Sequence, residues 1–329
     1  MTTEDTISPL PEWPEYGLVE DLLPTLTRWT TEGRRAALAT LVGITGSSPR
    51  PMGSEMVVAD NGEVAGYVSG GCVEAAVMHE ALASLADGLP RTLDYGAGSP
   101  VLDIQLTCGG RITIFVRAIT NLSVYVSRLS EARKDRRALT VLTNLKTGEM
   151  RFSDAEHTAA ASSEFAKLHE PPTRLILAGG DPVTLAILKL ARSMDMETIL
   201  LRPLGPEQGP PGLSAASYDR RNLDRAFEKL LPDRWTAVYT LTHDAFTDLR
   251  IAEYALKSAA FCVGILGSRR KIASRVDALR KAGIPDATLK RLHLPAGIEI
   301  GARSPVEIAV SILAQITASR NATLPQVTR

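Results

Sequence analysis

The stretch RLILAGGDPVTLAILKLARSMDMETILLRP, residues 174–203, decides the fold class. It alternates short, evenly apolar runs, RLILA and TILL, with a glycine turn and a segment of helical spacing. The same rhythm recurs where TAVYTLTH (236–243) precedes DAFTDLRIAEYALKSA, and where FCVGILGS (261–268) precedes RRKIASRVDALRKAG. Apolar strands alternating with helices are typical of a parallel sheet covered on both faces. The second half is therefore predicted to be a Rossmann-like doubly wound parallel-sheet domain.

The first half predicts a mixed α+β domain. ALATLVGIT (37–45) is a predicted strand, and EMVVADNGEVAGYVS (55–69) a hairpin with Asn61-Gly62 at its tip. Apolar residues at 73, 77, 81 and 85 predict a helix that stops at Asp87-Gly88. Predicted strands at 102–106 and 111–119, a helix at 123–135 and a hairpin at 138–152 follow. Pro171-Pro172 marks the boundary, so the predicted domains are 1–170 and 171–329.

Composition excludes several classes of protein. The chain has 329 residues, 44% hydrophobic and 22% charged, which is typical of a globular protein with two domains. Its 37 basic and 37 acidic residues give a net charge of +0, which argues against a general nucleic-acid or anionic-membrane binder. The N-terminus lacks the pattern of a secretory signal, and no segment has 18 apolar residues without charge. We therefore expect a cytoplasmic protein without a membrane partner.

Cysteine usage narrows the chemistry further. The chain has three cysteines, Cys72, Cys108 and Cys262, which form neither a C-x-x-C pair nor an even set. This pattern argues against a disulfide framework and against an all-cysteine zinc site. Two of the three lie beside paired glycines in the first half of the chain, and those turns are the first candidates for a functional site.

Gly70-Gly71-Cys72 stands between a predicted strand and a predicted helix. Paired glycines let the backbone turn sharply and bring a ligand close to bare peptide N–H groups. Cys72 is expected in the first helical turn, where the positive end of the helix dipole favours a thiolate, although Glu74 opposes this. The alternative is a small packed cysteine at a helix–strand junction, which is the commoner state of a free cysteine.

Thr107-Cys108-Gly109-Gly110 repeats the combination with the order reversed. A mixed fold that brings both turns to one sheet edge would produce a pocket with two thiols and several free N–H groups. Such a pocket suits a soft metal or a sulfur-bearing ligand. The alternative is two unrelated tight turns, which the spacing does not exclude.

The loop Gly46-Ser47-Ser48-Pro49-Arg50-Pro51 offers hydroxyls and a guanidinium on a stiff backbone. Ser47, Ser48 and Arg50 together suit a phosphate or carboxylate, which arginine binds through two parallel hydrogen bonds. The alternative is a surface connection with a solvated arginine.

The first turn of the second domain departs from a dinucleotide-binding fingerprint. Gly179-Gly180 stands where G-x-G-x-x-G is expected, and Asp181-Pro182 enters the helix. The acidic residue that would hold a ribose hydroxyl is replaced by Leu200-Leu201-Arg202. An ordinary NAD(P) site is therefore not expected here, and Arg202 suits a phosphate or no ligand.

Two later turns are further candidates. Gly267, Ser268 and Arg269 follow a predicted strand and open a helix, so a hydroxyl cap and positive charges would favour an anion. The alternative is a capped helix with solvated charges. His243-Asp244 lies at the end of a strand, where parallel sheets present functional side chains. Alternatively, Asp244 simply caps the next helix.

The motifs taken together resemble the XdhC/CoxI family, accessory proteins of xanthine dehydrogenase and related molybdenum hydroxylases. The motifs that carry the resemblance occur in order from about Ala37 to about Ile316: GSSPRPMG, SGGCVEAAV, YGAGSPVLDIQLTCGG, LTHD, GILGSRRK and LHLPAGIEIGARSPVEIAVSI. The resemblance implies an N-terminal XdhC/CoxI domain followed by a Rossmann-like domain. It places Cys72, Cys108 and the Ser47, Ser48 and Arg50 loop at the family's most characteristic positions.

The resemblance also implies a function. Members of the family bind molybdenum cofactor (molybdopterin), support its sulfuration together with a cysteine desulfurase, and pass it to the apo-form of a molybdenum hydroxylase. A chaperone of this type is expected to form a homodimer. The alternatives are a Rossmann-fold oxidoreductase that uses NAD(P), and a scaffold that holds the hydroxylase and the desulfurase without touching the cofactor.

Overall fold

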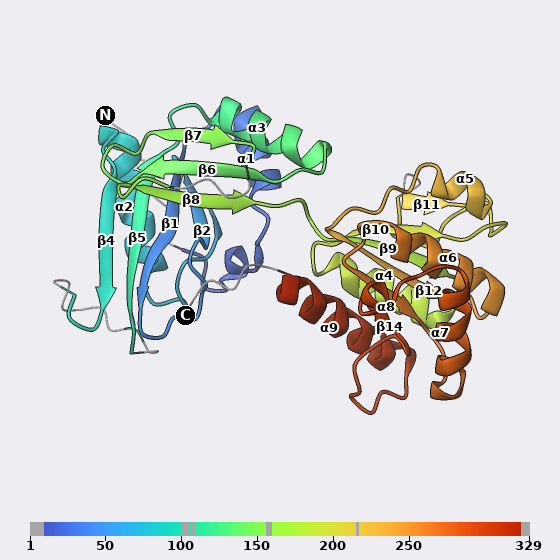
Figure 1. Cartoon of the computed structure of the whole chain (residues 1–329). Helices are drawn as coiled ribbons and strands as arrows, with labels where there is room; N and C mark the ends of the chain where they lie inside the picture. The colour runs from blue at the N-terminus through green and yellow to red at the C-terminus, as the bar shows by residue number, and fades with distance from the viewer. Residues whose placement is uncertain (1–9, 100–105, 107–108, 156–159, 215–216, 324–329) are drawn as a thin grey trace. The chain divides into compact units, whose positions relative to one another are not determined.

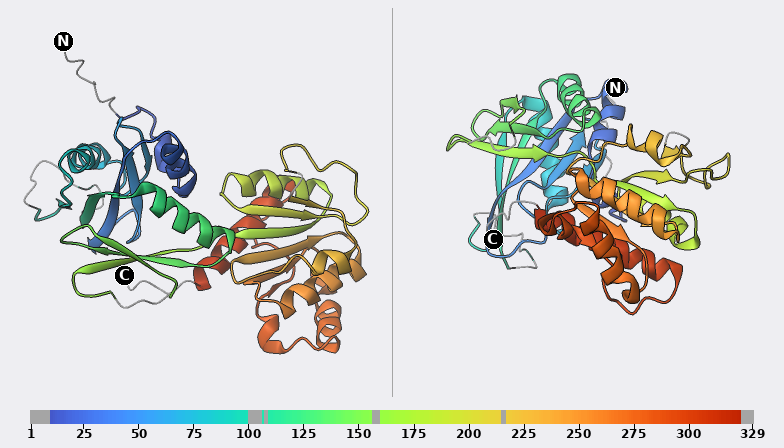
Figure 2. Two further views of the ribbon diagram at one scale, coloured as in Figure 1. Left: turned by 90° about the horizontal axis from the view of Figure 1, so that it is seen from above. Right: turned by 45° about the vertical axis from the view of Figure 1, so that its right-hand side comes forward.

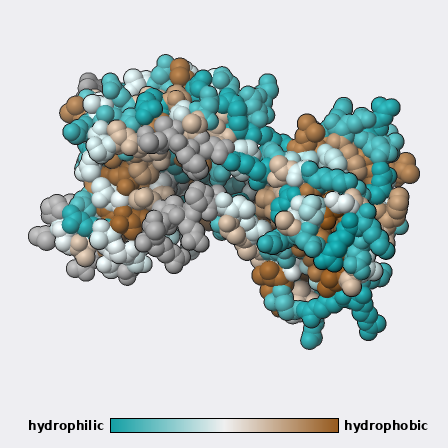
Figure 3. All heavy atoms as spheres, viewed as in Figure 1, coloured by the Kyte–Doolittle hydropathy of each residue, from teal (hydrophilic) through white to brown (hydrophobic). Residues whose placement is uncertain are grey.

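The structure, a computed structural model, describes residues 10–99, 106, 109–155, 160–214 and 217–323. The chain divides into two compact units, Met1–Pro171 and Pro172–Arg329, here called the N-terminal and C-terminal units (Figure 1). In the described part of the chain, each unit contains two apolar core clusters of its own. Hydrophilic side chains predominate on the visible face of each unit (Figure 3). Among the described helices, none is long and apolar enough to cross a membrane.

The N-terminal unit is built on a five-stranded antiparallel sheet with strand order β3-β2-β1-β5-β4. Its strands are β1 (Ala36–Thr45), β2 (Glu55–Ala59), β3 (Val64–Gly66), β4 (Arg91–Gly96) and β5 (Arg111–Ala118). Alternate side chains of the central strand β1 enter different cores: Ala37 and Ala39 lie in one, and Ala36 and Leu38 in the other. Both faces of this sheet are therefore covered.

Helix α2 (Glu74–Asp87) covers one face of the five-stranded sheet. Its Val77, Ala81 and Leu85 are buried at helical spacing, as the sequence predicts. The helix ends at Gly88, whose φ of 74° is left-handed and whose N–H bonds to the carbonyl of Ser84. The predicted helix and its glycine stop are confirmed.

The opposite face packs against helices and a second sheet (Figure 1). These elements are η1 (Glu15–Leu18), α1 (Leu23–Thr31), α3 (Leu122–Lys134), β6 (Leu139–Asn144), β7 (Met150–Ser153) and β8 (Glu164–His169). The second sheet is antiparallel with order β7-β6-β8. Trp29 of α1 and Tyr125 of α3 are the bulkiest side chains in this core and are at most 1% exposed.

The sequence predicts most of these elements but not β4 or β8. The hairpin of β2 and β3 is confirmed, with Gly62 at a φ of 86° in its turn. Strand β8 escapes prediction because its sequence, EFAKLH, is half-buried throughout and lacks a clear apolar alternation. The predicted strand at 102–106 lies, apart from Leu106, outside the described residues.

The C-terminal unit is a six-stranded parallel sheet with order β11-β10-β9-β12-β13-β14. Its strands are β9 (Arg174–Gly179), β10 (Glu197–Leu201), β11 (Tyr218–Asp219), β12 (Thr236–Leu241), β13 (Cys262–Ile265) and β14 (Leu292–His293). Its helices are α4 (Pro182–Arg192), α5 (Leu223–Phe227), α6 (Ala245–Lys257), η3 (Arg269–Lys271), α7 (Ile272–Lys281), α8 (Asp286–Leu289) and α9 (Pro305–Thr323). The predicted Rossmann-like fold is confirmed.

Helices cover both faces of the parallel sheet (Figure 2). Helices α4 and α9 share one core with β9 and β12, whereas α5, α6 and α7 share the other. Helix α9 starts in a capping box, because the Glu307 carboxylate accepts the Ser304 N–H at 2.8 Å and Ser304 Oγ accepts the Glu307 N–H at 3.3 Å. After β11 the chain returns to the other side of β9. The topological switch point therefore lies between the carboxyl ends of β9 and β12.

Candidate functional site

Three loops of the N-terminal unit meet beside the five-stranded sheet. A Cβ atom on Gly110 would lie 1.9 Å from the carbonyl oxygen of Ser47, so the turn before β5 packs directly on the loop after β1. A Cβ on Gly70 would lie 3.2 Å from Cγ of Pro49. The loop at 46–51 thus contacts both glycine turns that the sequence singles out. Backbone-to-backbone approach of this kind requires glycine.

A buried carboxylate holds the Gly70-Gly71 turn in place. Glu74 is 1% exposed, and its Oε1 accepts the N–H of Ser69 at 2.8 Å and that of Val68 at 3.3 Å. Its Oε2 accepts the Ser69 hydroxyl at 2.7 Å and the Val73 N–H at 3.3 Å. A buried carboxylate needs such donors to offset the loss of water. The first residue of α2 therefore ties the preceding loop to the helix.

Cys72 lies outside the helix that the sequence assigns to it. Helix α2 begins at Glu74 with Val73 as the N-cap, so the expectation of Cys72 in the first helical turn is wrong. The helix start is occupied by the Glu74 carboxylate instead. The Cys72 side chain is half-buried against the apolar core under α2, and its N–H points to Ser69 Oγ at 3.3 Å. Its predicted companion Cys108 lies outside the described residues.

Arg50 is held by an acidic residue that none of the sequence motifs contains. Its Nη1 and Nη2 donate to the two carboxylate oxygens of Glu20, each at 2.7 Å. The hydrogen bonds with Glu20 raise the pKa of Arg50. The guanidinium Nε is buried and has no hydrogen-bond partner among the described residues. The guanidinium predicted to bind an anion therefore does bind one, supplied by the chain itself.

The serines beside Arg50 stiffen the loop. Ser48 Oγ donates to the Arg50 carbonyl at 2.9 Å and accepts the Arg50 N–H at 3.3 Å, which makes a local turn. Ser47 contributes its backbone to the contact with Gly110. The expected bidentate site is thus built from Arg50, with the Ser48 hydroxyl turned toward its own loop.

Tyr67 and Lys167 complete the surroundings of this loop cluster. The hydroxyl of Tyr67 lies 3.3 Å from the position of a Cβ on Gly71, and burial followed by the charge of Glu74 raises the pKa of this tyrosine. Lys167 Nζ donates to the Gly53 carbonyl at 2.6 Å. Its charge also helps to lower the pKa of Glu20, after the larger effect of the Arg50 hydrogen bond. No sequence pattern indicates Lys167, because it lies on the unpredicted strand β8.

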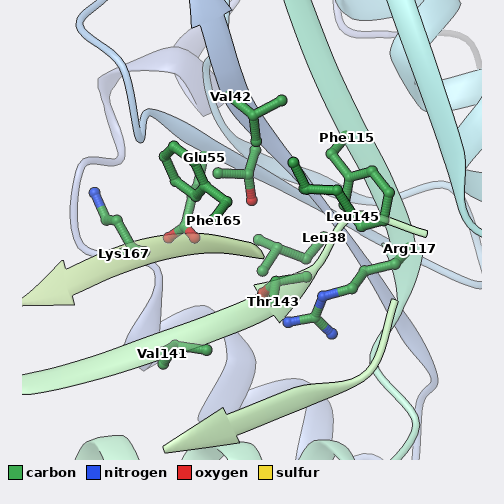
Figure 4. Close-up of a pocket in the computed structure, with 11 residues that line it drawn as sticks. Leu38, Val42, Glu55, Phe115, Arg117, Val141, Thr143, Leu145, Phe165 and Lys167 are labelled. Atoms are coloured by element: carbon green, nitrogen blue, oxygen red, sulfur yellow. The ribbon is translucent and has the colours of Figure 1, made fainter. Parts of the chain in front are cut away.

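A small cavity between the two sheets of the N-terminal unit adjoins Lys167 (Figure 4). Charged side chains of Glu55, Arg117 and Lys167 line it together with apolar ones. Arg117 is 3% exposed, donates to Met150 Sδ at 3.5 Å, and has its pKa lowered by burial. The cavity extends the polar character of the loop cluster into the space between the sheets.

The switch point of the C-terminal unit carries an acid–imidazole pair. His243 follows β12 with a left-handed φ of 62°, and its Nε2 lies 2.9 Å from Oδ2 of Asp181 after β9. Asp181 Oδ1 also caps α4 by accepting the Thr184 N–H at 2.8 Å. Burial alone would raise the pKa of Asp181, but hydrogen bonds from Thr184 and His243 lower it. Asp244 caps α6, so this predicted alternative is confirmed.

The turn after β9 does not fit an ordinary NAD(P) site. A Cβ on Gly180 would lie 2.5 Å from Cζ of Arg202, so the guanidinium covers the glycine turn where a pyrophosphate would approach. Gly179 packs against Thr184, where a Cβ would lie 2.5 Å from its Oγ1. Arg202 also stands at the end of β10 in place of an acidic residue.

The basic turn after β13 is structural in its details. A Cβ on Gly267 would lie 2.5 Å from Nη1 of Arg275, a buried side chain that donates to the Leu266 carbonyl at 3.1 Å. Ser268 makes no capping hydrogen bond through its side chain, and α7 begins only at Ile272 after the short helix η3. Arg269 is ion-paired with Glu299. The predicted hydroxyl cap is therefore wrong.

Comparisons with known proteins identify the family. A model described as the XdhC and CoxI family matches residues 29–96, and one described as the XdhC Rossmann domain matches residues 175–316. The molybdenum cofactor insertion chaperone PaoD of Escherichia coli (strain K12) is 31% identical over 322 residues, covering 93% of this chain and 92% of PaoD. The chain belongs to the XdhC/CoxI family. The resemblance seen in the sequence motifs is thereby confirmed.

Other relatives agree with this membership of the XdhC/CoxI family. A Bacillus subtilis (strain 168) protein, named as a probable xanthine dehydrogenase component, is 24% identical over 327 residues, covering 87% of this chain and 93% of the relative. A crystal structure of a Bacillus halodurans protein named as a xanthine dehydrogenase shares the fold, with a TM-score of 0.77 and 23% identity. It covers 93% of this chain and 97% of that chain. The family match at 29–96 contains the Arg50 loop and the Gly70-Gly71-Cys72 turn.

Proposed function

We propose that this XdhC/CoxI protein binds molybdenum cofactor, supports its sulfuration and delivers it to a molybdenum hydroxylase of the xanthine dehydrogenase type. The observation that carries the proposal is the identity of 31% with a relative named as a molybdenum cofactor insertion chaperone, over nearly the whole of both chains. The convergence of the Arg50 loop on both glycine turns supports a binding site in the N-terminal unit.

The loop cluster suits such a cargo chemically. A pterin dithiolene with a phosphate requires close backbone approach, a cation for the phosphate and a soft group near molybdenum. Gly70 and Gly71 supply bare backbone, and Arg50 supplies a guanidinium whose buried Nε has no partner among the described residues. Cys72 supplies a half-buried thiol beside them. We assign Cys108, from the third loop, to the same site.

The proposed cycle involves two protein partners. The apo-hydroxylase receives the cofactor, and a cysteine desulfurase supplies the sulfur, so the chaperone acts between them in the cytoplasm. We further propose that the chaperone works as a homodimer. In this cycle the chain holds, orients and releases its cargo, and the desulfurase performs the sulfur transfer.

Two other functions make different predictions. An NAD(P)-dependent oxidoreductase would bind NAD(H) or NADP(H) at the turn after β9, where Arg202 covers Gly180. Titration with both cofactors decides this, and absence of binding at millimolar concentration ends that alternative. A scaffold that never touches the cofactor would form complexes with hydroxylase and desulfurase that survive substitution of the cysteines.

Retention of molybdenum tests the leading proposal. The protein is purified with molybdenum cofactor, and bound molybdenum is measured for wild type, Cys72→Ala, Cys108→Ala and Arg50→Gln. We expect retention by wild type and loss in the variants. Cys262→Ala is the matched control, because Cys262 is fully buried in the C-terminal unit. Undiminished retention in both loop-cysteine variants would remove the thiols from the site, and no retention by wild type would overturn the proposal.

A further inference from the structure

A short N-terminal segment, residues 10–22, packs beside the loop cluster and is called the strap. A Cβ on Gly17 would lie 3.0 Å from Cδ2 of Tyr67, so glycine allows the strap to lie directly on that ring. The rings of Tyr16 and Tyr67 are 6.4 Å apart between centroids and tilted by 57°. Leu10 packs against the core on which Cys72 also lies. The strap therefore borders the proposed cargo site.

The strap ends in the acidic residue that occupies Arg50. Glu20 accepts two hydrogen bonds at 2.7 Å from Nη1 and Nη2, the paired geometry by which arginine also binds a phosphate. Lys167 lies close enough for its charge to lower the pKa of the same carboxyl. Two cations thus act on one carboxylate at the mouth of the glycine turns.

The carboxylate is placed for exchange. The Glu20 side chain is 62% exposed, whereas that of Arg50 is 23% exposed. Arg50 is fixed by its loop, while Glu20 can turn into solvent without leaving a buried charge behind. Ion pairs with such exposure contribute little net stability, so a phosphate with a greater charge can displace the carboxylate.

We infer that Glu20 holds, in the unloaded protein, the position on Arg50 that the phosphate of the molybdenum cofactor takes on binding. The strap moves away from Arg50 when the phosphate arrives, and Glu20 rebinds when the cargo leaves. This rests on the proposed function for the identity of the cargo. It adds a competing internal anion that limits affinity and favours release to the acceptor enzyme.

Phosphate titration tests this directly. The affinity for inorganic phosphate is measured at constant ionic strength by calorimetry for wild type, Glu20→Gln and Glu12→Gln. Glu12 is an exposed residue of the same strap, so its variant matches the change in charge. We expect roughly a tenfold gain in affinity for Glu20→Gln alone, as when a competent state is about a tenth populated in wild type. Arg50→Gln should remove the gain in the double variant.

The outcomes separate the inference from the proposed function. Equal phosphate affinity in Glu20→Gln and Glu12→Gln, with molybdenum still retained by wild type, would overturn the role of Glu20 and leave the chaperone function standing. A gain specific to Glu20→Gln, with no molybdenum retained by wild type, would support the exchange at Arg50 and overturn the assigned cargo. Retention of the gain in the Glu20→Gln, Arg50→Gln double variant would place the phosphate elsewhere and overturn the inference.

Discussion

The carboxylate of Glu74 accepts both the backbone N–H of Ser69, at 2.8 Å, and its hydroxyl, at 2.7 Å, within a pair of residues that are at most 1% exposed. The contact spans the Gly70-Gly71-Cys72 turn, so the turn is closed by a buried charge-assisted link between its two ends. The shape of the proposed cargo site therefore depends on a residue that does not itself face the cargo.

Replacement of Glu74 should disorder this turn. Glu74→Ala leaves the Ser69 and Val68 donors without their acceptor, and we expect a loss of roughly 3 kcal/mol in the free energy of unfolding. Glu74→Gln keeps one acceptor oxygen and should lose less. Urea denaturation of both variants checks this order, with His79→Ala on the exposed face of α2 as a control. Equal stability of Glu74→Ala and wild type would contradict the buried link.

Gly110 should tolerate no side chain. Its Cβ would lie 1.9 Å from the Ser47 carbonyl oxygen, so Gly110→Ala must displace the backbone of the Arg50 loop, at a cost of about 3 kcal/mol. Gly109→Ala is the matched control, because it meets nothing within 4 Å and carries only the cost of a left-handed φ of 70°, about 1 kcal/mol. Chemical denaturation compares them, and the contact is refuted if Gly109→Ala is the more damaging.

Asp181 should contribute to stability as a helix cap with a characteristic pH dependence. Asp181→Ala removes the acceptor for the Thr184 N–H and should cost about 1 kcal/mol, whereas Asp181→Asn keeps the cap. Because the pKa of Asp181 is lowered in the folded protein, the advantage of aspartate over asparagine is present above about pH 4 and disappears as pH falls through the folded pKa. Denaturation midpoints across acid pH measure it, and a difference that grows on acidification is incompatible with this sign.

Cys262 should resist alkylation in the folded protein. Burial raises its pKa to about 12 from 9.0, which lowers the thiolate fraction near neutral pH roughly a thousandfold. In a Cys72→Ser, Cys108→Ser double variant, iodoacetamide should therefore label Cys262 only after the protein is unfolded. The same variant in denaturant is the control, and rapid labelling of the folded protein would show that the thiol is accessible.

The strand–turn–helix pattern of the second half could be predicted because each parallel strand, buried on both faces, has an uninterrupted apolar sequence. Leu175, Ile176 and Leu177 are all at most 3% exposed. Strand β8 could not be predicted, since among the described strands it pairs only with β6 and stays half-buried, so its sequence carries little periodicity. The unpredicted strand concealed Lys167, and with it part of the charge around Arg50.

The start of α2 shows a second limit. Apolar spacing located the helix, but the position of its first turn depends on where the buried Glu74 carboxylate finds donors, and these come from Ser69 and Val68 upstream. Cys72 consequently lies before the helix. Side-chain hydrogen bonds of this kind shift a helix boundary by a residue or two without any change in the apolar pattern.

The sequence by itself determined the two fold classes, the glycine turns and the family, because apolar periodicity and short motifs are local properties of the chain. The tertiary structure alone decided which of those turns meet. It packed Gly110 on Ser47, and it laid Arg202 over Gly180. It also brought Glu20 to Arg50 across 30 positions of sequence. Contacts of this range depend on how sheets and loops pack together, and no local pattern records them.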